Sequence, residues 1–209
     1  MGQNRLFIAA GAGLAAVGAS LGLWAMVFGG AGGLFEKCGT GAIAGGAGSI
    51  GGAFTLTDHT GMAVTDSDVF SRPGLVYFGY TFCPDVCPLD VARNADAVDL
   101  LTKRGLDIRP VFITIDPERD TPEVLAEYVG YMHQNMLGLT GTLDQIKAAS
   151  QIYRTYYKKQ ETGDEYYLMD HSTFSYLVLP GVGFVNFFKN DESPEHVADT
   201  AACFLQEIG

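Results

Sequence analysis

The chain is short of basic residues. Its 209 residues include 13 lysines and arginines against 24 aspartates and glutamates, which gives a formal net charge of −11. Basic clusters with interleaved aromatic residues are absent, and so are internal repeats. A protein of this charge repels phosphate backbones, so the composition argues against nucleic acid as a partner. The acidity favours solubility, and a docking face for a basic partner is the alternative interpretation.

Charge is missing altogether from one segment near the N-terminus. Residues 6–35, LFIAAGAGLAAVGASLGLWAMVFGGAGGLF, contain no charged side chain. Because about 20 apolar residues suffice to cross a bilayer as a helix, the sequence predicts a transmembrane anchor region at 6–35. A cleaved signal peptide is the alternative, although its apolar part has only ~7–15 residues.

The flanks of this segment predict its orientation. Arg5 precedes it, whereas the charges of Glu36 and Lys37 after it cancel. Since positive flanks stay on the cytoplasmic side, residues 1–5 are expected in the cytoplasm. The sequence therefore predicts a single-pass inner-membrane protein whose C-terminal part faces the periplasm.

Residues 36–52 are rich in glycine and alanine and predict a flexible tether. The remainder, 53–209, is expected to form one domain. Strands and helices alternate in it, first as β-α-β and then as β-β-α, so the sequence predicts an α/β, thioredoxin-like fold with an added N-terminal β-hairpin. The expected elements are a hairpin at 53–66, buried strands at 74–82 and 108–116, a helix that has Cys87 in its first turn and stops at Gly105, helices at 119–132 and 142–157, a second hairpin at 173–190 and a helix at 193–208.

Cysteine is scarce, and two of the four cysteines stand together in YFGYTFCPDVCPLD, residues 77–90. Cys83 is expected in the loop after a buried strand and Cys87 in the first turn of the next helix, where the helix dipole favours a thiolate. A spacing of four residues at a helix start places the two sulfurs on the same side of the helix. There they can share a metal ion, form a redox-active disulfide or form a structural disulfide. The sequence leaves the redox state of Cys38 and Cys203 open.

Histidine is equally scarce, with four residues. Two sulfurs and one imidazole nitrogen are suitable ligands for Cu(I), a soft ion that accepts a low coordination number. A zinc site would require a fourth protein ligand or a catalytic water. His171 precedes a predicted buried strand and is one candidate for the imidazole; His59, His133 and His196 are expected on turns and helix ends.

Three separated motifs, FGYTFCPDVCP, ITIDPERDTPE and YLMDHSTFSYLVLP, resemble in order and spacing the Sco/SenC family of membrane-anchored copper proteins that assist cytochrome c oxidase assembly. The resemblance covers residues 51–208. It implies a thioredoxin-like fold and a copper ion, as Cu(I) with Cu(II) as a second state, held by Cys83, Cys87 and His171. It also implies the copper-bearing subunit of the oxidase as partner.

The resemblance favours a metallochaperone that gives copper to the dinuclear copper centre of cytochrome c oxidase, rather than a turnover enzyme. The alternatives are a thiol-disulfide oxidoreductase, in which Cys83 and Cys87 are the catalytic dithiol, and a redox sensor. Thioredoxin-like oxidoreductases usually have the motif C-x2-C and a proline before the strand that faces it. This chain has C-x3-C, and its MDHSTF segment contains no proline. Both differences favour metal binding over disulfide exchange. Asp116 is a further candidate, for steering copper or for pairing with Arg119 at a helix start, and Asp170 is a candidate for orienting His171.

Overall fold

The computed structural model describes residues 35–38, 50–161 and 166–208. The chain divides into two compact units, residues 1–39 and 40–209. Of the first unit only Phe35 and the 3-10 helix η1 (Glu36–Cys38) are described. The predicted anchor, apart from Phe35, and most of the predicted tether therefore lie outside the described residues. No helix within the described ranges has the length and apolar character that a membrane span requires.

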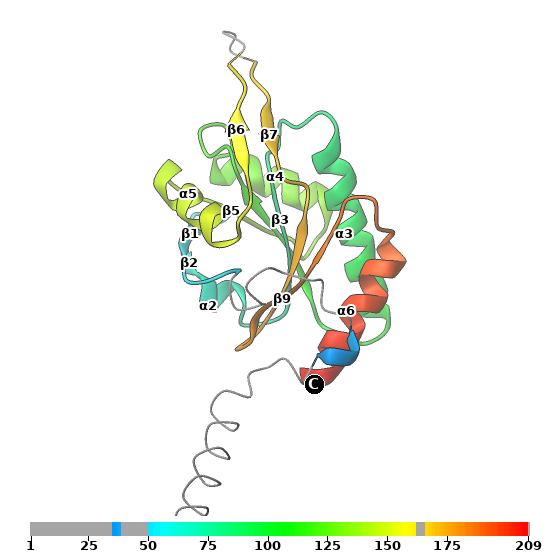
Figure 1. Cartoon of the computed structure of the whole chain (residues 1–209). Helices are drawn as coiled ribbons and strands as arrows, with labels where there is room; N and C mark the ends of the chain where they lie inside the picture. Colours follow the sequence, from blue (N-terminus) through cyan, green and yellow to red (C-terminus); the bar gives the residue numbers. More distant parts are fainter. Residues whose placement is uncertain (1–34, 39–49, 162–165, 209) are drawn as a thin grey trace, which may run out of the picture. The chain divides into compact units, whose positions relative to one another are not determined.

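A seven-stranded mixed sheet forms the centre of the second unit (Figure 1). Its order is β2-β1-β5-β4-β3-β8-β9, with β3, β4 and β5 parallel and the other pairs antiparallel. A separate two-stranded sheet pairs β6 with β7. The strands are β1 (Thr55–Asp58), β2 (Ala63–Thr65), β3 (Gly74–Gly79), β4 (Arg109–Thr114), β5 (Leu137–Thr140), β6 (Tyr157–Lys159), β7 (Met169–His171), β8 (Ser175–Leu179) and β9 (Gly183–Phe188).

Side chains from the residues just before them cap four of the described helices, the first through a capping box of Thr65 with Asp68. Thr121 accepts a hydrogen bond from the Val124 N–H, and Ser193 accepts one from the N–H of His196. Thr142 forms a reciprocal capping box with Gln145. The described helices of this unit are α2 (Asp66–Val69), α3 (Val86–Lys103), α4 (Pro122–Met132), α5 (Leu143–Ile152) and α6 (Pro194–Ile208).

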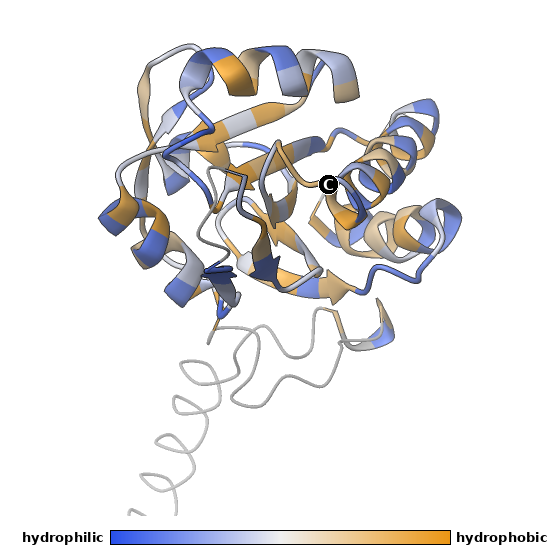
Figure 2. Cartoon of the chain, turned by 90° about the horizontal axis from the view of Figure 1, so that it is seen from above, coloured by the Kyte–Doolittle hydropathy of each residue, from blue (hydrophilic) through white to orange (hydrophobic). Residues whose placement is uncertain are grey.

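Helices cover both faces of the sheet, as the alternation along β3 makes clear. The Tyr77 hydroxyl donates to Asp90 of α3 on one face, whereas the ring of Phe78, the next residue, packs against Tyr153 at the end of α5 on the other. Figure 2 shows hydrophobic residues gathered in the central strands and hydrophilic ones along the outer sides of the helices. The sheet is therefore buried on both faces, which explains the uninterrupted apolar sequence of β3.

The predicted α/β, thioredoxin-like architecture is confirmed, including the N-terminal hairpin β1–β2. The predicted helix at 142–157 is too long, since α5 ends at Ile152. Arg154 takes a positive φ of 53° there, and the N–H of Thr155 returns to the Ser150 carbonyl. Tyr157 then begins β6. The short strands β5, β6 and β7 were not predicted from the sequence.

Candidate metal centre

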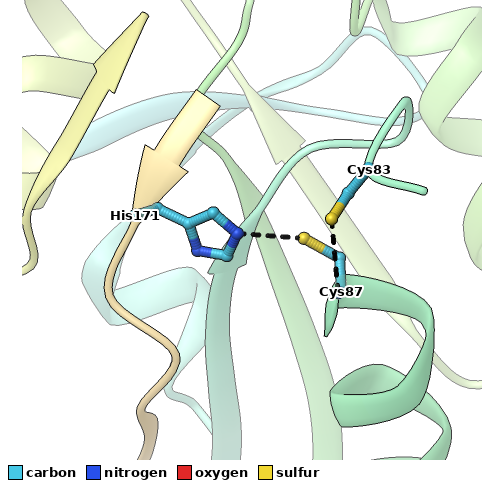
Figure 3. Close-up of side chains that lie close together, drawn as sticks. All are labelled: Cys83, Cys87 and His171. Atoms are coloured by element: carbon cyan, nitrogen blue, oxygen red, sulfur yellow. Dashed lines mark hydrogen bonds between the residues drawn. The ribbon is translucent and has the colours of Figure 1, made fainter. Parts of the chain in front are cut away.

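The two cysteines lie where β3 gives way to α3 (Figure 3). Cys83 is in the connecting loop and Cys87 is the second residue of the helix. Asp85 stands at the N-cap but makes no side-chain cap hydrogen bond. The backbone N–H of Cys87 donates instead to Cys83 Sγ at 3.4 Å. The Cys83 sulfur thus accepts a hydrogen bond at the positive end of the helix dipole.

His171 ends β7 and turns its ring toward the sulfurs (Figure 3). Its Nε2 atom is 3.3 Å from Cys87 Sγ, although the two residues are 84 positions apart in the chain. The three potential ligand atoms of Cys83, Cys87 and His171 all lie within 4.8 Å of one another. Among residues 35–38, 50–161 and 166–208, no other group of three or more His, Cys, Asp or Glu side chains could hold a metal ion.

The hydrogen bonds of His171 indicate which ring nitrogen can bind a metal. Nδ1 lies 2.8 Å from the carbonyl oxygen of Ser172, and because a carbonyl only accepts, Nδ1 is the donor. Burial lowers the pKa of His171, and the Ser172 carbonyl and nearby carboxylates oppose this only in part. A neutral ring with its proton on Nδ1 leaves Nε2 free to accept, and Cys87 is the donor that faces it.

The Cys87 thiol is in its protonated form in this arrangement, and the thiolate expected from its place in the first turn of the helix is wrong because burial outweighs the helix dipole. The residue has no exposed surface, and burial raises the pKa of its thiol. Binding a metal through the sulfur therefore releases a proton. Cys83 is only partly buried, so the two thiols differ in access to solvent.

Two tyrosines hold the imidazole from the side. The rings of Tyr77 and Tyr80 stand edge-on to His171, with centroids 6.2 and 5.9 Å away. The Tyr77 hydroxyl donates to Asp90 Oδ2 at 2.9 Å. The Tyr80 hydroxyl accepts a hydrogen bond from the backbone N–H of Met169 at 3.3 Å. This bond connects β7 to the cysteine loop, residues 80–85 between β3 and α3.

Gly79, the last residue of β3, leaves space for the buried sulfur. A Cβ atom at this position would lie 3.0 Å from Cys87 Sγ and 2.8 Å from Cε1 of Tyr77. Such distances are shorter than ordinary van der Waals contact. The glycine is thus required by the close approach of the helix start to the strand.

Asp120 anchors the loop that carries Cys83. The residue has no exposed surface, and its carboxylate accepts from the Thr81 N–H at 3.0 Å and the Thr81 hydroxyl at 2.6 Å. A third hydrogen bond comes from the hydroxyl of Thr114 at the end of β4. The sequence predicted neither this role nor those of Gly79, Tyr77 and Tyr80. The only signal is position, since Gly79, Tyr77 and Tyr80 lie in or next to the cysteine motif and Asp120 lies in the motif ITIDPERDTPE.

Of the two carboxylates that the sequence singled out, Asp116 has the predicted pairing with Arg119, whereas Asp170 does not orient His171. Asp116 is buried, pairs with Arg119 and accepts from the Tyr167 hydroxyl. Asp170 is exposed and accepts from Gln160 Nε2 at 2.6 Å. The carbonyl of Ser172, rather than Asp170, accepts the hydrogen bond from Nδ1 of His171.

The other three histidines lie away from the cysteines in the fold. His59 Nδ1 accepts from the Gly138 N–H. His133 is 3.3 Å from an Asp99 carboxylate oxygen, and His196 is 3.6 Å from one of Glu192. Of the four histidines, the structure brings His171 alone to the two sulfurs.

The group of side chains fits a soft, low-coordinate cation. It supplies two sulfurs and one imidazole nitrogen and no carboxylate oxygen, and such ligands select Cu(I) over hard cations. Cys83 and Cys87 are also free thiols, so the same pair can form a disulfide with loss of two electrons and two protons.

Comparisons with known proteins agree with this site. The family model described as SCO1/SenC matches residues 44–206. Protein SenC of Rhodobacter capsulatus is 55% identical over 159 residues, which are 76% of this chain and 72% of that protein. The structure of Arabidopsis thaliana ScoI with copper bound is similar at 39% identity and a TM-score of 0.70, covering 76% of this chain and 98% of that one. That of Bradyrhizobium japonicum ScoI with copper bound is similar at 38% identity and a TM-score of 0.68, covering 75% and 99%.

Proposed function

Because the chain belongs to the SCO1/SenC family, we propose that it binds copper and delivers it to the dinuclear copper centre of cytochrome c oxidase. The observation that carries the proposal is the meeting of Cys83 Sγ, Cys87 Sγ and His171 Nε2 within 4.8 Å. Copper is the cargo here, held by the two thiolates and the imidazole. The soft sulfur ligands favour the Cu(I) state, and Cu(II) is the second state that the site would accept.

The unequal burial of the ligands supports a transfer function. Cys87 is enclosed, whereas Cys83 and His171 are partly open to solvent. An acceptor's ligands would therefore reach copper from the side of Cys83 and His171 and exchange those bonds first. Cys87 would keep its bond longest, so that copper is not released to solvent during the exchange.

A second candidate function is supported by the free dithiol. Cys83 and Cys87 are adjacent, reduced and at a helix start. In a thiol-disulfide exchange they would pass two electrons and two protons to a partner's disulfide and become oxidised themselves. The same chemistry would serve a redox sensor. Neither function requires His171.

We also propose the location and the partner. Residues 6–35 would anchor the protein in the inner membrane with residues 1–5 in the cytoplasm, and residues 53–209 would form the copper-binding domain in the periplasm. The acceptor would be the copper-bearing subunit of the oxidase. The net charge of −11 makes nucleic acid an unsuitable partner.

The test compares Cu(I) affinity with dithiol chemistry. Full-length protein in detergent is titrated with Cu(I) in competition with a colorimetric chelator, and the dithiol reduction potential is measured on the same samples. His171→Ala should weaken Cu(I) binding, by about 10-fold or more for a lost ligand, and leave the dithiol able to cycle. Cys83→Ser and Cys87→Ser should each abolish both properties, because each sulfur is needed for both.

His196→Ala is the matched control, since this histidine is exposed and lies on α6. It should change neither property. Unchanged Cu(I) affinity in His171→Ala would remove this histidine from the site and favour the oxidoreductase function.

A further inference from the structure

The two halves of the metal site belong to segments that share no sheet. Cys83 follows β3 of the large sheet, whereas His171 ends β7, which pairs with β6 in the separate two-stranded sheet. Hydrogen bonds of a β-ladder therefore do not fix the distance from the imidazole to the sulfurs. Side-chain contacts between the two segments must do so, together with the short link from His171 to β8, which pairs with β3.

Arg119 makes several of these contacts, beside the stacking of Phe82 on Tyr166 and the hydrogen bond from the Met169 N–H to the Tyr80 hydroxyl. Its guanidinium carbon lies 4.8 Å from the ring centroid of Phe82, the residue before Cys83, and 3.7 Å from that of Tyr167, four residues before His171. It is also 5.6 Å from the centroid of the Tyr80 ring. One cation thus stacks between the cysteine loop and the segment that leads into β7.

Hydrogen bonds fix the orientation of this cation. Arg119 Nε donates to Asp116 Oδ2, and Nη1 donates to the backbone carbonyl of Tyr167 at 2.9 Å. The Tyr167 hydroxyl in turn donates to the other oxygen of Asp116 at 2.8 Å. Arginine, carboxylate and tyrosine form a closed ring of contacts in which the planar guanidinium has one orientation.

We propose that Arg119 is a positioning residue for the metal centre, holding the strand of His171 against the loop of Cys83 so that the imidazole meets both sulfurs. This rests on the proposed copper binding and adds a residue that does not touch the ligand atoms. Arg119 acts through His171. Without it, the two cysteines keep their helix-start geometry while the imidazole loses its fixed approach.

The experiment is a double-mutant cycle on Cu(I) affinity in the full-length protein. Arg119→Ala should weaken Cu(I) binding by about 10- to 100-fold, the usual effect of removing a residue that orients a ligand. The double variant Arg119→Ala/His171→Ala should bind no more weakly than His171→Ala alone, because the same contribution is lost only once. The dithiol reduction potential of Arg119→Ala should stay that of the wild type, which a general loss of structure would not allow.

Arg119→Lys separates position from charge. Lysine keeps the positive charge but lacks the planar fork that stacks and donates in two directions, so Cu(I) affinity should remain low. Arg104→Ala is the matched control, since this arginine forms an exposed ion pair with Asp199, and it should leave the affinity unchanged. If Arg119→Ala does not fold, Tyr167→Leu replaces it in the cycle with the same expectation.

The outcomes separate this proposal from the proposed function. If His171→Ala leaves Cu(I) affinity unchanged, the three-ligand site fails and the positioning role fails with it. If His171→Ala weakens binding but Arg119→Ala does not, the positioning role alone is wrong. Additive losses in the double variant, or full affinity in Arg119→Lys, would also overturn it.

Discussion

At the scale of single residues, Gly79 sets how closely the strand end and the helix start can approach. Gly79→Ala would place a Cβ atom 3.0 Å from Cys87 Sγ and 2.8 Å from the Tyr77 ring. Because both neighbours are buried in the core, the sulfur must shift from its position opposite His171. We expect weaker Cu(I) binding and a loss of about 1–3 kcal/mol in the free energy of unfolding.

The measurements are the Cu(I) competition titration and urea unfolding of the metal-free protein. Gly130→Ala is the matched control, because Gly130 lies inside α4 and a Cβ atom there has no neighbour within 4 Å. That variant should gain about 0.5–1 kcal/mol through helix propensity and bind Cu(I) normally. Normal Cu(I) affinity in Gly79→Ala would show that the sulfur does not depend on this close approach.

At the scale of elements, the loop between β3 and α3 is held by the carboxyl group of Asp120. Because this group is buried, its ionisation lowers the free energy of unfolding. Burial raises the pKa of Asp120, although hydrogen bonds from Thr114 and Thr81 oppose the shift. A carboxyl group with a raised folded pKa contributes stability that is complete below the unfolded pKa of about 3.9. Between the unfolded and the folded pKa, the folded state holds a proton on Asp120 that the unfolded state has already lost. The contribution is therefore lost as pH rises through the folded pKa.

Asp120→Asn should remove this pH dependence. The amide does not ionise, so the stability of the wild type relative to the variant should fall as pH rises above about 4. Urea unfolding of both proteins at several pH values between 4 and 7 measures the difference, in which the other titrating groups cancel. A difference that grows in favour of the wild type with pH would mean that the hydrogen bonds to the carboxylate outweigh its burial.

The elements also explain how far the sequence could predict the fold. β3 and β4 were predictable because burial on both faces leaves uninterrupted apolar runs. The helix α3 was predictable from apolar residues at helical spacing, and α4 and α6 from a cap residue followed by proline. The strand β5, LGLT, is too short and too rich in glycine to give a pattern. The strands β6 and β7 pair only with each other, outside the large sheet. Their sequences therefore lack the hydrophobic alternation that would predict a strand.

The site follows the same division between local and distant signals. Cys83 and Cys87 were predictable because their roles depend on local chain geometry. His171 needed the family resemblance, since it meets Cys87 across 84 positions. Arg119 pairs locally with Asp116, and Asp120 with Thr114. The contacts of Arg119 with Phe82 and Tyr167 span 37 and 48 residues, and that of Asp120 with Thr81 spans 39. They depend on the folded arrangement of loops, for which neither periodicity nor spacing gives a signal.

At the scale of the whole molecule, the fold brings the candidate site to one edge of the sheet. Cys83 follows the carboxyl end of β3, and Asp116 and Asp120 follow that of β4. Open α/β sheets place their binding sites at this edge because the loops that leave parallel strands converge there. The large hydrophobic side chains Phe82, Leu89 and Phe174, close in sequence to the three candidate ligands, are exposed. A copper acceptor that docks over the site would cover them.

The compartment of the domain decides whether such an acceptor can be reached, and a topology experiment tests it. Arg5 lies before the uncharged residues 6–35, and the charges of Glu36 and Lys37 after them cancel, so the N-terminus should stay in the cytoplasm. Alkaline phosphatase needs disulfides to be active, so a fusion after Gly209 should be active only if that end is in the periplasm. The same fusion without residues 6–35 should be inactive. Activity of a cytoplasm-only reporter at Gly209 in the full chain would contradict this orientation and place the dithiol in a reducing compartment.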